Sequence, residues 1–138
     1  MVHFPKRWRK IPHKRLADLY RNGSVIFHHP FKLFYQIQPA QSEGKSGCKI
    51  IISVPKRNIK RAIDRNRIKR QIRESYRLNF NELHQITDER KVQIELLCLY
   101  LPNEHTPTST LSNKVASLLG RLTQLVAQVG APAVSGVD

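Results

Sequence analysis

The chain has 138 residues, 40% of them hydrophobic, and a formal net charge of +14. This length suits one domain with a single modest core. No apolar run approaches the roughly 18–20 residues that a membrane-spanning helix needs, which argues against a membrane protein. The basic start of the chain lacks the apolar segment of a secretory signal, so we expect a mature cytoplasmic protein.

The positive charge is concentrated in the first half of the chain. Residues 1–77 carry 20 Lys and Arg against four acidic residues, a net charge of +16, whereas residues 78–138 carry −2. A charge needed only for solubility would be spread more evenly, so this asymmetry indicates a polyanionic partner. Nucleic acid is favoured over an anionic membrane, because few large apolar residues lie opposite the basic ones.

The chain is predicted to begin with a basic arm over residues 1–11 and a short helix after it. Pro12 suits the first turn of a helix, since its fixed φ and missing N–H are tolerated there. Three residues then follow at helical spacing on one face: Leu16, Leu19 and Tyr20. Gly23 is expected to end this helix.

Three strands are predicted next, over residues 24–28, 31–38 and 48–54. Pro30 separates the first two strands, and the third is a β-branched run. Residues 39–47 are rich in Gly and Ser, so we expect a flexible hairpin loop between the second and third strands.

The second of these strands has two different faces. One face is apolar and contains Phe31, Leu33, Tyr35 and Ile37. The other contains Lys32, Phe34, Gln36 and Gln38. An aromatic ring among polar neighbours is a candidate for stacking on a nucleobase, although an ordinary partly buried Phe would give the same pattern. Tyr20 could join Phe34 or belong to the core.

The second half of the chain is predicted to contain a basic helix over residues 62–80, a strand over 92–101 and a leucine-rich helix over 111–129. Gly130 is expected to end the last helix, and residues 131–138 form a predicted disordered tail. The leucine stripe fits burial on the sheet better than a dimer interface.

These elements make one α+β domain over residues 12–130, in the order α-β-β-β-α-β-α. We expect helices packed on a mainly antiparallel four-stranded sheet. Cys48 and Cys98 lie in apolar runs without zinc-ligand spacing, so they are predicted to be buried free thiols.

The basic helix has an unusual excess of like charge. Between Lys56 and Arg77 the chain has ten Lys and Arg against only Asp64 and Glu74. Helical spacing places Asn66, Arg70, Arg73 and Arg77 on one face, with Lys69 at its border and Arg65 and Arg67 on its flanks. A separate apolar stripe can seat the helix on the sheet: Ile68, Ile72 and Tyr76.

Such crowding destabilises a helix by a few tenths of a kcal/mol per like-charged i,i+4 pair. A solvated face stabilised by ion pairs would need more acidic partners. Guanidinium groups instead suit bidentate contacts with phosphate, which indicates nucleic-acid binding. RNA is favoured over DNA, because the helix lies between two strands and does not follow another short helix as in helix-turn-helix proteins.

No catalytic residue or metal ligand is predicted in this chain, because it has no Gly-x-Ser-x-Gly elbow, no His-x-x-x-His pair and no acidic cluster for two metals. Only His28 and His29 are close in sequence, and adjacent strand residues face opposite ways. We expect no small-molecule substrate.

Residues 65–77, RNRIKRQIRESYR, resemble the Arg-Asn-Arg signature of the protein subunit of bacterial ribonuclease P. Residues 51–57, IISVPKR, are similar to the strand that precedes this signature in the family. The resemblance runs from about Arg9 to Val129. It implies an accessory subunit that helps a catalytic RNA remove the 5′ leader from precursor tRNA, while the RNA and its Mg²⁺ ions carry out the cleavage.

The resemblance also implies a fold and a set of contacts. The fold is an α-β-β-β-α-β-α sandwich with a left-handed crossover, shared with one domain of a small-subunit ribosomal protein. The catalytic RNA would be bound by Arg65, Asn66, Arg67, Lys69, Arg70 and Arg73, and Arg77 extends the same face. The leader would lie in a cleft with Tyr20, Phe34, Lys56 and Arg57.

The sequence departs from the family pattern at several positions. Leu16 stands where Phe is common, and residues 58–61 replace a shorter turn, which shifts the alignment of the basic pair before them. Tyr35 would replace Phe34 in the cleft if the strand register moved by one residue. The alternatives are a ribosomal-type RNA-binding protein and a dimeric DNA-binding regulator.

Overall fold

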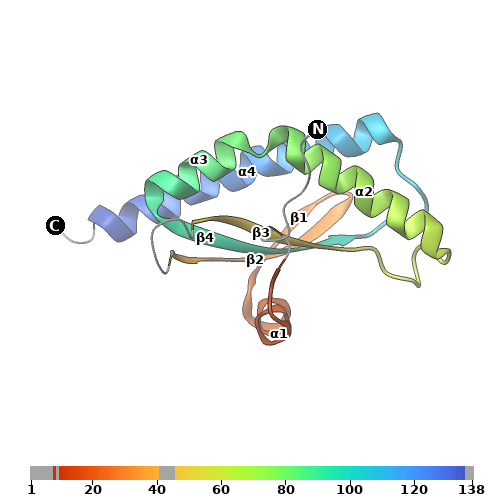
Figure 1. The fold of residues 1–138 in the computed structure, drawn as a ribbon, viewed down its shortest axis with the longest axis horizontal. Helices are drawn as coiled ribbons and strands as arrows, with labels where there is room; N and C mark the ends of the chain where they lie inside the picture. Colours follow the sequence, from red (N-terminus) through yellow and green to blue (C-terminus); the bar gives the residue numbers. More distant parts are fainter. Residues whose placement is uncertain (1–7, 9, 41–45, 136–138) are drawn as a thin grey trace.

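The computed structural model describes residues 8, 10–40 and 46–135. The elements in chain order are α1 (His13–Asn22), β1 (Ser24–His28), β2 (Phe31–Pro39), β3 (Gly47–Ser53), α2 (Ala62–Asn79), α3 (Asn81–Arg90), β4 (Val92–Tyr100) and α4 (Thr108–Ser135). Helix α1 lies on one face of the sheet, and α2, α3 and α4 cover the other face (Figure 1). The α+β prediction is confirmed.

The four strands have the order β1-β2-β4-β3. β1 pairs antiparallel with β2, and β2 antiparallel with β4, whereas β3 and β4 are parallel neighbours. The predicted hairpin between β2 and β3 is wrong, because β4 is inserted between these two strands. The residues of β2, β3 and the loop between them do not indicate that a strand from later in the sequence will lie between them.

The core lies between the sheet and the helical layer formed by α2, α3 and α4. The apolar stripe of α2 is buried as predicted, with Ile68, Ile72 and Tyr76 at most 1% exposed. Helix α4 also buries its stripe: Leu111, Val115, Leu118, Leu119, Leu122 and Val126. This helix therefore contributes its leucines to the core of the same chain and does not present them as a dimer surface.

The helix α3 was not predicted. Its ten residues bury only Leu83 and Thr87 fully, so the apolar periodicity is short. It ends at Lys91, which adopts a left-handed conformation (φ 56°) where glycine is the usual residue. Neither end of α3 therefore has a clear signal in the sequence.

The two ends of the chain also differ from expectation. Helix α4 continues to Ser135, past Gly130 and into the predicted disordered tail. One glycine inside a helix costs only about 1 kcal/mol, so it does not have to end the helix. Residues 136–138 and most of the predicted basic arm lie outside the described residues. Within that arm, Trp8 is 8% exposed.

Trp8 packs on the junction of α2 and α3. Its ring centroid lies 4.7 Å from that of Phe80, 5.0 Å from that of His84 and 5.7 Å from that of Tyr76. The Tyr76 hydroxyl and the Nε2 atom of His84 are 2.8 Å apart. Trp8 is thus attached to the helical layer through an aromatic cluster.

Candidate nucleic-acid interface

Helix α2 presents its basic residues on the sides that packing leaves to solvent. Since Ile68, Ile72 and Tyr76 are buried, the opposite side faces outward. Three predicted RNA-contact residues are exposed there: Asn66, Arg67 and Arg70. Lys69 and Arg73 are half-buried. The helix therefore carries a row of cationic and polar side chains, as its periodicity predicted.

Two of the predicted contact residues have partners within the protein. The Arg65 guanidinium donates hydrogen bonds to the backbone carbonyls of Ile59 (3.0 Å) and Lys60 (2.7 Å). Arg77 forms an ion pair with Glu74 at 2.5 Å, and its side chain is only 16% exposed. The hydrogen bond from Arg77 lowers the pKa of the Glu74 carboxyl. Both arginines therefore stabilise the local structure as well as adding positive charge.

Two surface hollows adjoin the first turns of α2. The first, of about 570 Å³, is lined by basic and polar residues that include Arg57, Lys60, Arg61, Arg67 and His105. The second, of about 610 Å³, is lined by Arg61, Ile63, Asp64, Asn66, Arg67 and Arg70. No side chain caps the N-terminus of α2, and that end of a helix favours anions. Charge and helix geometry at this end both suit phosphate groups.

A cleft of about 420 Å³ separates α1 from the sheet and α2. Its α1 wall is formed by His13, Leu16, Ala17 and Tyr20. Its floor is formed by residues 51–53 of β3 and by Val54 directly after this strand, together with Leu97 of β4. Lys69 of α2 also lines this cleft. One residue of the basic row is therefore shared between the α2 surface and the cleft.

The predicted aromatic pair is present, but its two members have different environments. The rings of Tyr20 and Phe34 have centroids 5.0 Å apart. Tyr20 is 64% exposed, whereas Phe34 is 5% exposed. Tyr35 packs against the hydrophobic core on the other face, so the register that places Phe34 on the α1 side is confirmed. Phe34 lies under the Tyr20 ring and supports it.

The predicted basic pair follows β3. Lys56 and Arg57 are both exposed in the connection that leads to α2. Arg57 lines the 570 Å³ hollow beside α2, and neither residue lines the cleft itself. Arg57 therefore belongs to the hollow beside α2, and neither cation is part of the cleft lining that contains Tyr20.

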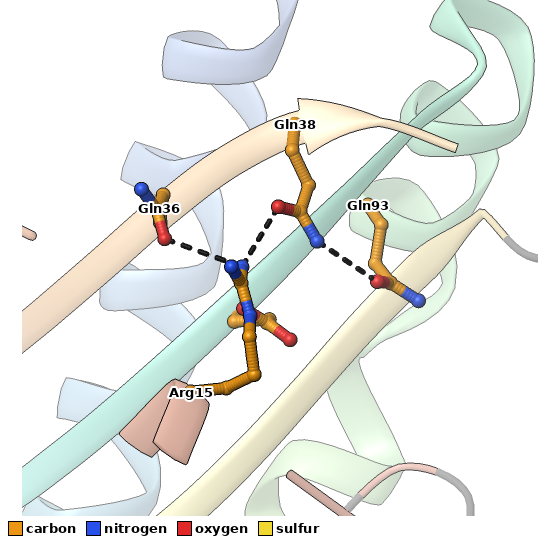
Figure 2. Close-up of polar contacts among 5 residues, drawn as sticks. Arg15, Gln36, Gln38 and Gln93 are labelled. Carbon is orange, nitrogen blue, oxygen red and sulfur yellow. Dashed lines mark hydrogen bonds and ion pairs between the residues drawn. The ribbon is translucent and has the colours of Figure 1, made fainter. Parts of the chain in front are cut away.

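An ion pair with a buried glutamate, which the sequence patterns did not predict, fixes α1 on the sheet. Glu95 of β4 is 3% exposed, and its Oε1 atom accepts hydrogen bonds from the Nε atom (3.1 Å) and a terminal nitrogen (2.5 Å) of Arg15. Arg15 also donates to Gln36 (3.3 Å) and Gln38 (2.7 Å), and Gln38 donates to Gln93 (3.3 Å), as Figure 2 shows. The bond with Glu95 raises the pKa of Arg15.

This network could have been suspected from one signal. A glutamate lies inside the predicted strand 92–101, on the same alternating face as Gln93. A carboxylate in that position needs a cation opposite it when the face is covered. Which of the 24 Lys and Arg would supply the cation depends on the tertiary structure.

In the part of the chain that the structure describes, no group of three or more His, Cys, Asp or Glu is arranged to hold a metal ion. The carboxylates nearest the basic surface already face arginines: Asp64 lies 3.7 Å from Arg61, and Glu74 pairs with Arg77. Of the described helices, none combines the length and apolar character required to cross a lipid bilayer.

A basic helix beside a cleft that contains an exposed tyrosine ring is typical of a nucleic-acid-binding protein. A family model described as ribonuclease P matches residues 4–123. The ribonuclease P protein component of Porphyromonas gingivalis is 26% identical over 107 residues, which are 78% of this chain and 77% of the relative. That of Chlorobium phaeobacteroides is 29% identical over 92 residues, covering 62% of this chain and 63% of the relative. The chain belongs to the ribonuclease P protein family.

Solved structures show the same fold. The ribonuclease P protein of Thermotoga maritima matches with a TM-score of 0.63 at 18% identity, covering 82% of this chain and 96% of the other. The Staphylococcus aureus protein matches with a TM-score of 0.59 at 20% identity, covering 82% and 93%. The fold that the resemblance implied is therefore confirmed.

Proposed function

We propose that this chain is the protein subunit of a ribonuclease P ribonucleoprotein and assists a catalytic RNA in removing the 5′ leader of precursor tRNA. The match to the family over residues 4–123 is the observation that carries the proposal. The chain acts through two adjacent surfaces, the basic side of α2 and the cleft beside α1.

The catalytic RNA lies along α2. Arg67 and Arg70 offer exposed guanidinium groups, which bind phosphate oxygens in bidentate fashion. The deep, narrow major groove of an RNA helix does not admit a protein helix, so α2 follows RNA backbones and recognises their shape. Lys69, Arg73 and Asn66 extend this contact, and Arg65 and Arg77 add charge while holding the helix in place.

The single-stranded leader lies in the cleft. Tyr20 offers an exposed ring supported from below by Phe34, which suits stacking on a base of any sequence. Lys69 in the same cleft, with Lys56 and Arg57 nearby, neutralises leader phosphates. Because Lys69 also belongs to α2, a leader in the cleft lies next to the RNA bound by that helix.

The cleavage chemistry is assigned to the RNA. Mg²⁺ prefers oxygen ligands such as carboxylates, and Asp64 and Glu74 near the basic surface are each paired with an arginine. We assign the Mg²⁺ ions of the reaction to the RNA, and the protein contributes binding, orientation and charge neutralisation. We place the protein in the cytoplasm, together with precursor tRNA.

The test is reconstitution at low Mg²⁺ with the ribonuclease P RNA of the same organism and a precursor tRNA, followed by release of the 5′ leader. We expect cleavage only when protein and RNA are both present. Tight RNA binding without stimulation of cleavage would reject the proposal and favour a ribosomal-type RNA-binding protein.

A further inference from the structure

The sheet face that forms the floor of the cleft continues past Phe34 to the edge strand β1. The register pairs Val25 with Phe34 and Phe27 with Lys32. Because alternate residues of a strand share a face, Phe27 and Lys32 lie on the same side of the sheet as Phe34. The floor of the cleft and this edge thus form one continuous surface.

Phe27 is a large aromatic residue that the fold leaves in solvent. It is 66% exposed, and Val25 on the same face of β1 is 46% exposed. The Nζ atom of Lys32 lies 5.3 Å from the centroid of the Phe27 ring and 5.2 Å from that of Phe34. Within about 6 Å, an ammonium group is attracted to the face of each ring. The lysine therefore joins the exposed ring to the ring that supports Tyr20.

An exposed aromatic ring beside an ammonium group favours one class of binding partner. An apolar protein surface would cover Phe27 only by also removing water from the Lys32 ammonium. A single-stranded nucleic acid supplies a base for the ring and a phosphate for the ammonium. Pairing of another strand with β1 is opposed, because Arg121 of α4 donates a hydrogen bond to the Phe27 carbonyl (3.2 Å).

We propose that Phe27 and Lys32 form a second nucleotide site that extends the leader track from Tyr20 to the edge of the sheet. Phe27 lies one strand spacing, about 5 Å, from β2, and two residues, about 7 Å, farther along than the position opposite Phe34. This diagonal of roughly 8 Å corresponds to two or three stacked nucleotides at about 3.4 Å each. The site takes a leader nucleotide farther from the cleavage point than the one at Tyr20. This inference rests on the proposed function of the cleft.

The test uses the full chain assembled with its catalytic RNA and a series of precursor tRNAs whose leaders are shortened one nucleotide at a time. The affinities of wild type, Phe27→Leu, Phe27→Tyr and Lys32→Gln are compared. Phe27→Leu keeps an apolar side chain but removes the aromatic face, and Phe27→Tyr keeps that face. Since Phe27 is exposed, these variants are expected to fold, and thermal unfolding of each one verifies this. Val25→Ala is the matched control on the same strand and face.

We expect Phe27→Leu to weaken binding of long-leader precursors about fivefold or more, the lower end for one stacked base. Short-leader precursors, mature tRNA and the catalytic RNA alone should be bound as by wild type, and Phe27→Tyr should retain affinity. Equal affinity of wild type and Phe27→Leu for every leader, or an equal loss on all RNAs, would overturn the second site. If wild type fails to stimulate cleavage, the proposed function fails as well. If wild type stimulates cleavage but Phe27→Leu binds long-leader precursors as tightly as wild type, the second site is refuted and the proposed function is not.

Discussion

Tyr20 and Phe34 are in contact but have different roles in the cleft. Tyr20 is 64% exposed, so its ring is available to a ligand, whereas Phe34 is 5% exposed and fills the space beneath it. A substitution at each position should therefore affect a different measurable property: ligand affinity for Tyr20 and folding stability for Phe34.

Tyr20→Ala should weaken binding of leader-bearing precursor tRNA by about 1–3 kcal/mol, because one base loses its stacking partner. Folding stability should change by no more than about 0.5 kcal/mol, as is usual for an exposed side chain. Affinities of the reconstituted complex for precursor and mature tRNA provide the measurement. An equal loss for both RNAs would argue against base stacking at Tyr20.

Phe34→Ala should lower the free energy of unfolding by about 3–5 kcal/mol, because it leaves a cavity under Tyr20. Leader affinity should fall only as a consequence, through loss of support for the Tyr20 ring. Urea denaturation monitored by circular dichroism measures the first effect. A variant as stable as wild type would contradict the supporting role.

Cys48 and Cys98 are free and buried, and burial raises the pKa of each thiol to about 12. The reactive thiolate is therefore scarce in the folded state, and we expect negligible alkylation by iodoacetamide at pH 8 until urea is added. Because the unfolded thiols ionise near their ordinary pKa of 9.0, stability should fall as the pH rises from about 9 towards 12. Rapid labelling of the native protein would refute this.

At the scale of elements, α2 combines a buried stripe with a charged outer side. Exposure of Arg67 and Arg70 makes them better probes of phosphate contact than Arg73, which is half-buried and has interactions within the protein. The packing of Ile68 and Ile72 does not depend on the outer residues, so charge can be changed there without unfolding the helix.

Arg67→Glu combined with Arg70→Glu should weaken binding to the catalytic RNA and reduce its salt dependence. Each lost phosphate contact removes about 0.7–0.9 from the slope of log affinity against log salt. The matched control is Lys91→Glu with Lys114→Glu, two exposed positions away from α2 that change the net charge equally. A salt slope that is the same in both double variants would exclude a specific α2 contact.

The position of α1 depends on the ion pair between Arg15 and the buried Glu95. Arg15→Met should destabilise the protein by about 1–3 kcal/mol, below the 3–5 of a fully buried pair because the Arg15 side chain is 36% exposed. Arg15→Met with Glu95→Leu should recover part of this loss, because no charge is left buried. Denaturation of wild type, Arg15→Met and the double variant measures this recovery, and a double variant less stable than Arg15→Met would contradict the prediction.

The molecule as a whole carries a net charge of +14 on 138 residues. The basic residues gather on α2 and on the segment before it, and few acidic residues oppose them. Self-repulsion of this kind destabilises the compact state, and a bound polyanion relieves it.

A polyanion such as heparin should therefore raise the thermal unfolding midpoint of the wild-type protein. At 100 times the Kd the stabilisation is about 2.7 kcal/mol, which corresponds to roughly 5–10 °C. The shift should be smaller for the Arg67→Glu, Arg70→Glu variant than for the Lys91→Glu, Lys114→Glu control. Equal shifts would mean that the polyanion binds by overall charge and not at α2.

Features that depend on local periodicity and charge could be predicted from the amino-acid sequence. The α2 stripe of Ile68, Ile72 and Tyr76, the buried leucines of α4 and the faces of β2 follow from spacings of 3.6 and 2 residues. The basic row on α2 follows from the same helical spacing, and the Arg-Asn-Arg signature is a property of the sequence alone.

Which of these residues come into contact depends on long-range packing. Insertion of β4 between β2 and β3, the burial of Phe34 under Tyr20 and the pairing of Arg15 with Glu95 all depend on contacts between residues distant in the chain. The intramolecular partners of Arg65 and Arg77 could not be predicted either. Helical spacing places a guanidinium group on one face of a helix, but it does not show whether a carbonyl or carboxylate lies within hydrogen-bonding distance. The sequence therefore specifies the charged and apolar faces, and packing determines which side chains remain free to bind RNA.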